Sequence, residues 1–154
     1  MIDSSECVVS FQMPSYTFPE LDSDSDRSVT IELQSEAEVT VRVQVNVIAF
    51  TSGGSVTEAT RNQDYSFNDG LFVNFVEGEV RSMSIPLSIL ADDLVERREG
   101  FTLQFFRAPD SPPITDGPNP TTTVFIDDSD GKYLTIINQQ LQYEHDNIGM
   151  FLMN

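Results

Sequence analysis

Polar and apolar residues alternate with a period of two over much of this chain. The clearest run is 38–47, where valine occupies every second position from Val39 to Val47. Successive side chains of a β-strand point to opposite faces of a sheet, so this run predicts a strand with one buried face. Seven shorter stretches of the same character predict further strands at 7–11, 16–18, 28–33, 71–75, 82–90, 101–106 and 122–126.

Turn signals separate these predicted strands. Ser52-Gly53-Gly54, Asn68-Asp69-Gly70 and Glu77-Gly78 each lie between two apolar runs, and glycine and asparagine supply the backbone conformations that tight turns need. No stretch shows a convincing helical period. Short strands at near-regular spacing therefore predict an all-β fold, an antiparallel β-sandwich.

Two segments between the strands have an unusual composition. Segment 108–120 holds five of the eight prolines, so we expect it to stay unpaired, either as an extended hairpin excursion or as a plain solvent loop. Segment 22–26 alternates Asp and Ser like a calcium loop. It lacks the glycine and the distal glutamate of an EF-hand, which favours a solvated turn.

Charge excludes several classes of partner. The 154 residues include 25 acidic and eight basic side chains, for a formal net charge of −17. This field repels nucleic-acid phosphates and anionic membranes, and no apolar run is long enough for a membrane span. The hydrophobic fraction of 39% is sufficient for the core of one domain. Such a chain attracts cations.

Few residues are available for covalent catalysis. Cys7 is the only cysteine and His145 the only histidine, which excludes an intrachain disulfide, a cysteine zinc cluster and most nucleophile–histidine pairs. No glycine-rich nucleotide fingerprint is present. A hydrolase with paired carboxylates remains as an alternative, but the chain has no tryptophan to line a cleft. We therefore expect a protein that is not an enzyme.

Carboxylates gather where the predicted strands begin or end. Asp64 precedes one strand, the acidic segment 92–99 follows another, and the run 127–130 ends a third. A sandwich collects its loops at two ends, so strands that run the same way deliver these acids to one edge. Crowded carboxylates repel one another unless a cation neutralises them, and Ca²⁺ accepts six to eight oxygen ligands. Spacing alone also fits ordinary polar strand ends.

Taken in order, these segments resemble the Calx-beta family. The aromatic-to-Glu start Tyr16-Thr17-Phe18-Pro19-Glu20 is similar to the opening of that domain, and the resemblance covers roughly Val8 to Asp130. The segments that carry it are Asp64-Tyr65, Val73-Asn74-Phe75-Val76-Glu77-Gly78-Glu79, Ser84-Ile85-Pro86-Leu87-Ser88-Ile89-Leu90-Ala91-Asp92-Asp93, Glu96-Arg97-Arg98-Glu99-Gly100-Phe101-Thr102-Leu103 and Thr123-Val124-Phe125-Ile126-Asp127-Asp128-Ser129-Asp130.

The resemblance implies an immunoglobulin-like sandwich of about seven strands that holds calcium at one end, as in the regulatory domains of sodium/calcium exchangers. Leu94 would add a backbone carbonyl. Ser129 and Ala91 stand where exchanger domains carry acids, which implies fewer ions or weaker binding. Arg97 and Arg98 are expected to point to solvent. The matched metal ligands are Glu20, Asp64, Asp92, Asp93, Glu96, Glu99, Asp128 and Asp130.

The chain continues past the matched region. We divide it into a Calx-beta-like sandwich, 1–131, and a strand-like tail, 132–154. Residues 134–143 align modestly with residues 7–16, so the tail is interpreted as the truncated start of a next repeat. Alternatively it adds a strand to its own sheet, or to a neighbouring copy in a homo-oligomer or fibre.

The predicted function is a non-enzymatic, calcium-binding adhesion, matrix or filament-forming module, extracellular or at the cell surface, in which calcium rigidifies the loop end. This location rests on the usual contexts of the family and on abundant calcium outside cells. The alternative is a cytosolic calcium-sensing regulatory domain of a membrane transporter. A sensor requires micromolar or tighter affinity, whereas an extracellular structural site needs only about 0.1–1 mM.

Overall fold

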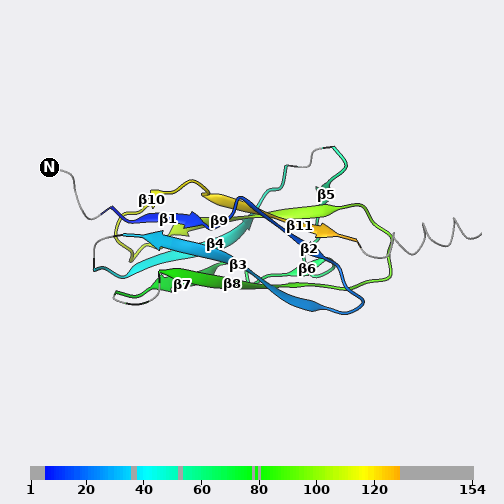
Figure 1. Cartoon of the computed structure of the whole chain (residues 1–154), viewed down its shortest axis with the longest axis horizontal. Coiled ribbons are helices and arrows are strands. Elements are labelled where there is room, and N and C mark those ends of the chain that lie inside the picture. The colour runs from blue at the N-terminus through cyan, green and yellow to red at the C-terminus, as the bar shows by residue number, and fades with distance from the viewer. Residues whose placement is uncertain (1–5, 36–37, 52–53, 78, 80, 129–154) are drawn as a thin grey trace, which may run out of the picture.

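The computed structural model describes residues 6–35, 38–51, 54–77, 79 and 81–128, which form a sandwich of two curled sheets (Figure 1). None of these residues belongs to a helix that could cross a bilayer. The strands are β1 (Val8–Phe11), β2 (Ser15–Pro19), β3 (Ser25–Gln34), β4 (Val41–Ile48), β5 (Thr57–Glu58), β6 (Tyr65–Ser66), β7 (Leu71–Phe75), β8 (Ser82–Ile89), β9 (Glu99–Arg107), β10 (Thr115–Asp116) and β11 (Thr121–Asp127).

Sheet A has the strand order β10-β1-β3-β8-β6, and sheet B has the order β2-β11-β9-β4-β7 with β5 paired to β9. All eight strands predicted from the alternation are present, which confirms the all-β sandwich. The three two-residue strands β5, β6 and β10 are additional, because two residues are too short to show a period. Most neighbours pair antiparallel, but β2–β11, β1–β10 and β5–β9 are parallel.

The alternating residues form the core between the sheets. Val41, Val43 and Val45 of β4 are fully buried, whereas the residues between them reach the outer surface. Each buried valine contributes about 1.5–3 kcal/mol relative to an exposed one. The rings of Tyr65 and Phe101 join the two sheets, with centroids 3.8 Å apart and planes 9° from parallel.

The proline-rich segment corrects one expectation. Thr115–Asp116 pairs in parallel with β1, in register with Val8 and Val9, so the prediction that segment 108–120 stays unpaired is wrong. Its prolines lie on either side of β10, and the two residues of β10 keep their N–H groups. The N–H of Gly117 continues the contact with a 2.7 Å bond to the carbonyl of Val9.

The acidic run 22–26 is partly in the sheet. Asp22 is exposed in a bend, as a solvated turn requires, but β3 already begins at Ser25. Asp24 Oδ1 accepts a 2.8 Å hydrogen bond from the N–H of Ala91, and Asp26 Oδ1 accepts one of 2.9 Å from Ser88 Oγ. These exposed acids therefore attach the start of β3 to β8 and to the segment after it.

Candidate metal centre

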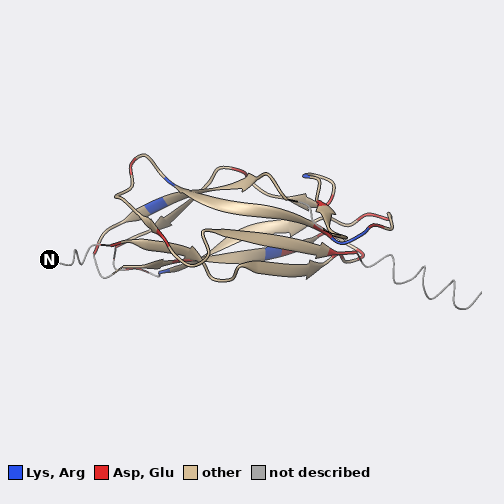
Figure 2. Ribbon diagram, turned by 90° about the horizontal axis from the view of Figure 1, so that it is seen from above, with Lys and Arg blue, Asp and Glu red and all other residues tan. Residues whose placement is uncertain are grey.

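Carboxylates meet at one end of the sandwich, which we call the metal end. The strands β2, β8 and β11 end there, and β6 and β9 begin there (Figure 1). Figure 2 shows acidic segments collected at this end, away from the N-terminus. The strand directions therefore place acids from distant parts of the sequence close together, as the sandwich topology predicted.

Three of these carboxylates form a compact group. Asp64, Glu96 and Glu99 each offer one oxygen, and these oxygens all lie within 4.8 Å of one another. Asp64 precedes β6, Glu96 lies in the β8–β9 connection, and Glu99 is the first residue of β9. Two segments that are distant in the sequence thus contribute to one set of oxygen donors.

A tight turn fixes Asp64. Its N–H donates to the carbonyl of Thr60 over 2.9 Å, and its Oδ2 accepts a hydrogen bond from the N–H of Thr60. Asn62 has a φ of 63° in this turn, a conformation that asparagine adopts more readily than most residues. Asp64 is therefore held in a buried position, 9% exposed.

Crowding makes these acids hard to ionise together. Burial, followed by the hydrogen bond and the charge from Asp64 and the charge of Glu96, raises the pKa of Glu99 to about 8. Burial also raises the pKa of Glu96, as do the charges of Asp64, Asp92 and Asp128. Without a cation the group therefore retains a proton near neutral pH, whereas a bound cation would remove the repulsion.

Three further carboxylates order the surrounding loop. Glu20, 6% exposed, accepts a 2.9 Å bond from the N–H of Asp92. Asp92 Oδ1 accepts from the N–H of Leu94 at 2.7 Å, and Asp128 Oδ2 accepts from the N–H of Glu96 at 2.8 Å. The loop that carries Glu96 is therefore positioned by the acids that directly follow β2 and β11 and by Asp92 within the loop itself.

Seven of the eight predicted ligands accordingly lie at the metal end, and three of them form the compact group. Asp93 is exposed beside Asp92 and does not belong to that group as the described residues define it. Asp130 lies outside the described residues, as does the tail 132–154, so the predictions for both stay predictions.

The two arginines behave differently from each other. Arg97 is exposed, as expected. Arg98, expected to point to solvent, instead pairs its Nε with Asp127 Oδ1 at 3.0 Å. Its guanidinium also lies 4.5 Å from the ring centre of Phe125 and donates to Thr17 Oγ1 over 2.9 Å. The neighbouring acid and ring hold it against the outer side of sheet B.

Two threonines of the site were missed from the sequence. Thr60 anchors Asp64 through its backbone, and Thr57 Oγ1 donates to Glu99 Oε1 at 3.4 Å. Backbone anchoring depends on the turn and on the pairing of β5 with β9 rather than on the identity of the side chain. No motif in the sequence therefore marks either residue.

The donor set fits a hard cation. The compact group offers only carboxylate oxygens, the ligands that Ca²⁺ and Mg²⁺ prefer, whereas zinc and copper sites favour histidine or cysteine. The group lies in a loop and at strand ends and has further acids close by. Calcium tolerates such irregular coordination better than magnesium does.

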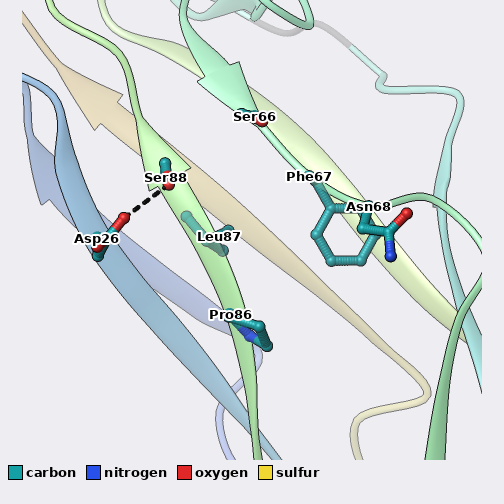
Figure 3. Close-up of a pocket in the computed structure, with 7 residues that line it drawn as sticks. All are labelled: Asp26, Ser66, Phe67, Asn68, Pro86, Leu87 and Ser88. Atoms are coloured by element: carbon teal, nitrogen blue, oxygen red, sulfur yellow. Dashed lines mark hydrogen bonds between the residues drawn. The ribbon is translucent and has the colours of Figure 1, made fainter.

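A separate hollow of about 400 Å³ lies where the chain leaves β6 (Figure 3). Phe67 and Asn68 form one wall, and residues 86–88 of β8 face them, with Asp26 beside Ser88. Asp26 is its single carboxylate. The hollow therefore does not extend the metal-binding group.

Comparisons with known proteins agree with this geometry. The family model of the Calx-beta domain matches residues 3–130. The crystal structure of the apo-form Calx CBD1 domain is 19% identical, with a TM-score of 0.63 over 81% of this chain and 99% of that one. The Calx CBD2 domain is 20% identical, with a TM-score of 0.63 over 90% and 98%.

The calcium binding domain CBD12 of CALX1.1 is 19% identical, with a TM-score of 0.62 over 79% of this chain and 44% of that one. At this level of identity the solved structures show a shared fold. No curated protein matches the sequence. Calx-beta domains bind calcium, and by the family match over residues 3–130 this chain belongs to the Calx-beta family.

Proposed function

We propose that this chain is a non-enzymatic calcium-binding domain in which Asp64, Glu96 and Glu99 ligate Ca²⁺. The convergence of these three carboxylates from two distant segments, with one oxygen of each within 4.8 Å of the others, carries the proposal. Glu20, Asp92 and Asp128 support it because their hydrogen bonds hold the loop in place.

Calcium would act by bridging carboxylates that otherwise need a retained proton to lie so close together. Asp64 leads into β6, Glu99 begins β9, and Glu96 belongs to the loop between β8 and β9. One ion on all three replaces the retained proton and fixes the loop relative to both sheets. The consequence is a loop end that is rigid in calcium and looser without it.

A calcium-sensing regulatory role is the form of this function that we favour. Membership of the Calx-beta family and likeness to calcium binding domain CBD12 support it. That relative is longer than this chain, which supports a neighbouring domain as the element that receives the change. The extracellular adhesion or filament module is the competing form, and a dissociation constant of about 0.1–1 mM rather than micromolar or tighter would favour it.

The test is thermal unfolding in excess calcium, in excess magnesium and in chelator, with affinity from calorimetric titration. Calcium at 100 times its dissociation constant stabilises by about 2.7 kcal/mol, which raises the unfolding midpoint by several degrees for a domain of this size. The double variant Glu96→Gln/Glu99→Gln should lose this rise. The control Glu77→Gln, an exposed acid outside the metal end, should keep it.

An equal rise with magnesium, or an undiminished rise in the double variant, would overturn the assignment of the site. A calcium-specific rise with millimolar affinity would instead overturn the sensing role and leave the site intact. The two parts of the proposal are therefore tested separately.

A further inference from the structure

The outer face of sheet B is uncharged over a long stretch of a strongly acidic chain. The residues of β4 from Gln44 to Ile48, of β9 from Gly100 to Phe106 and of β11 from Thr121 to Phe125 include no charged side chain. Those that point outward are at least partly accessible, apart from Gly100. In a chain with a net charge of −17, an uncharged surface of this kind is where a neutral partner meets the least electrostatic cost.

The first row across this face carries two exposed rings. Gln44 of β4 lies opposite Phe72 on one side and Phe106 on the other. The rings are 41% and 43% exposed. Since each strand spacing is about 4.8 Å, two phenylalanines on either side of one strand are about 10 Å apart at the backbone.

The first ring is held in place by its surroundings. The guanidinium of Arg42 lies 3.9 Å from the ring centre of Phe72. Arg42 in turn bonds Asp110 at 3.0 Å. A ring fixed before a ligand arrives loses less conformational entropy on binding.

The next two rows supply amides and hydroxyls. Asn46 lies opposite Gln104, which pairs with Thr121. In the following row Thr102 and Thr123 are paired, with their hydroxyl oxygens 3.5 Å apart. Amides and hydroxyls both donate and accept hydrogen bonds.

A fourth row returns to aromatic side chains. Phe125 lies opposite Gly100, where an added Cβ would be 3.1 Å from the ring of Phe50. The guanidinium of Arg98 lies 4.5 Å from the ring centre of Phe125, so the uncharged part of the face ends at the third row, about 14 Å from Phe106 at the rise of a strand. We call the first three rows, with two exposed rings at one end and amides and hydroxyls beside them, the ring face.

We propose that the ring face binds an extended, neutral polysaccharide. Phenyl rings offer flat apolar platforms for the C–H faces of sugar rings, and paired amides and hydroxyls match the dense hydroxyls of a glycan. A surface about 14 Å long suits a chain of a few sugar units rather than a single sugar.

Other occupants fit the ring face less well. Acidic glycans and nucleic acids are repelled by the net charge of the chain. A second copy or another protein needs an apolar interface core, but here amides and hydroxyls separate the exposed rings. A neutral polyhydroxylated ligand satisfies both the charge and the polarity of the face.

The experiment is affinity electrophoresis of the full chain in gels that contain mixed-linkage β-glucan, xyloglucan or galactomannan, with polygalacturonate as the charged counterpart. Insoluble cellulose and chitin are tested by sedimentation, and a glycan array extends the panel. All assays are run in calcium and in chelator. Since the exposed ring of Phe106 lies at the opposite end of β9 from Glu99, binding is expected to persist in chelator.

Phe106→Ala should weaken binding about tenfold, and Phe72→Ala/Phe106→Ala should abolish it. Leu94→Ala, which removes an apolar side chain that is 60% exposed at the metal end, serves as the matched control and should bind like the parent chain. Circular dichroism and unfolding midpoints check that each variant folds.

Absence of binding to every neutral glycan, or unchanged binding in the folded double variant, would overturn the proposal. Preference for polygalacturonate would do the same. A concentration-dependent dimer that the double variant loses would assign the ring face to a second copy instead. Because these readouts do not need calcium, their failure leaves the proposed metal site untouched.

Discussion

The two ends of this sandwich are stabilised in different ways. At the metal end, acids accept backbone hydrogen bonds but also repel one another, and Glu99 holds a proton that solvent-exposed glutamates lose. At the opposite end, which we call the far end, β10 pairs with β1, and the guanidinium of Arg107 donates to the carbonyl of Ser111. The far end is thus held by hydrogen bonds between its own segments, whereas the acids of the metal end repel one another and favour a cation.

This difference shows that one end of a domain can be stable by itself while the stability of the other end depends on a bound cation. Strand β9 takes part in both, since it begins at Glu99 in the carboxylate group and reaches the ring face at Phe106. A change in calcium alters the first residue of this strand, while the buried side chains further along stay packed. We therefore expect mutations at the two ends to be distinguishable by their dependence on calcium.

The largest expected effect comes from a pair of core truncations. Phe101→Ala removes a ring stacked on Tyr65, the residue after Asp64, and Phe75→Ala removes an equally buried ring away from the carboxylates. Each should lower the free energy of unfolding by about 3–5 kcal/mol, measured by urea denaturation. Only Phe101→Ala should also weaken calcium binding, by calorimetry. Equal affinities for the two variants would show that the stacked rings do not position the site.

Gly117→Ala should destabilise the far end without affecting the metal end. An added Cβ would lie 2.6 Å from the Cβ of Ser10 and 3.1 Å from the carbonyl oxygen of Val9, so β10 must move off β1. We expect a loss of about 1–3 kcal/mol in unfolding free energy, equal in calcium and in chelator. A loss that calcium rescues would mean that the two ends are coupled.

The pH dependence of stability should distinguish the metal end from the far end. Because the pKa of Glu99 rises from 4.5 to about 8 on folding, the folded state keeps a proton that the unfolded state has released. Stability without calcium should therefore fall as pH rises from about 4.5 to 8.

Calcium displaces this proton, so its affinity should increase over the same pH range. Unfolding midpoints and calorimetric titrations at several pH values measure both trends. Glu99→Gln should flatten the stability profile, and an unchanged slope in that variant would assign the trend to other acids.

The smallest effects are expected for two exposed ion pairs. Arg98→Gln removes the 3.0 Å contact with Asp127 at the metal end, and Arg42→Gln removes the 3.0 Å contact with Asp110. Each should change the unfolding free energy by less than about 1 kcal/mol. Arg98→Gln alone should tighten calcium binding slightly at low salt and not at high salt. A tightening that persists in high salt would indicate a structural change rather than a charge effect.

Much of the fold follows from local pattern. The valines of β4 alternate because one side of the strand meets the core, so the sequence predicts both the strand and its buried face. The pairing of Thr115–Asp116 could not be predicted, because it depends on which groups of β1 remain available after β3 has paired. Two paired residues are too few to produce a recognisable alternation of polar and apolar positions in the sequence.

The sequence predicts which residues belong to the site, but not how they are arranged. Order along the chain associated Asp64, Glu96 and Glu99 with one end. That Asp92 supports the loop while Asp93 is exposed depends on the 2.7 Å bond from the N–H of Leu94 to Asp92 Oδ1. This turn forms because the side chain of Asp92 accepts a bond from the backbone two residues later. The spacing of acids in the sequence does not predict such a bond.

The parallel pairing of β2 with β11 has a mechanical consequence. Five residue pairs, from Ser15 with Thr123 to Pro19 with Asp127, align the first and last strands of sheet B. β1 lies toward the opposite end of the sandwich from the point where β11 stops (Figure 1). Tension between these points would pull the two strands past each other lengthwise. Their hydrogen bonds would then be loaded together rather than opened one by one, so the domain is suited to transmit force along its long axis.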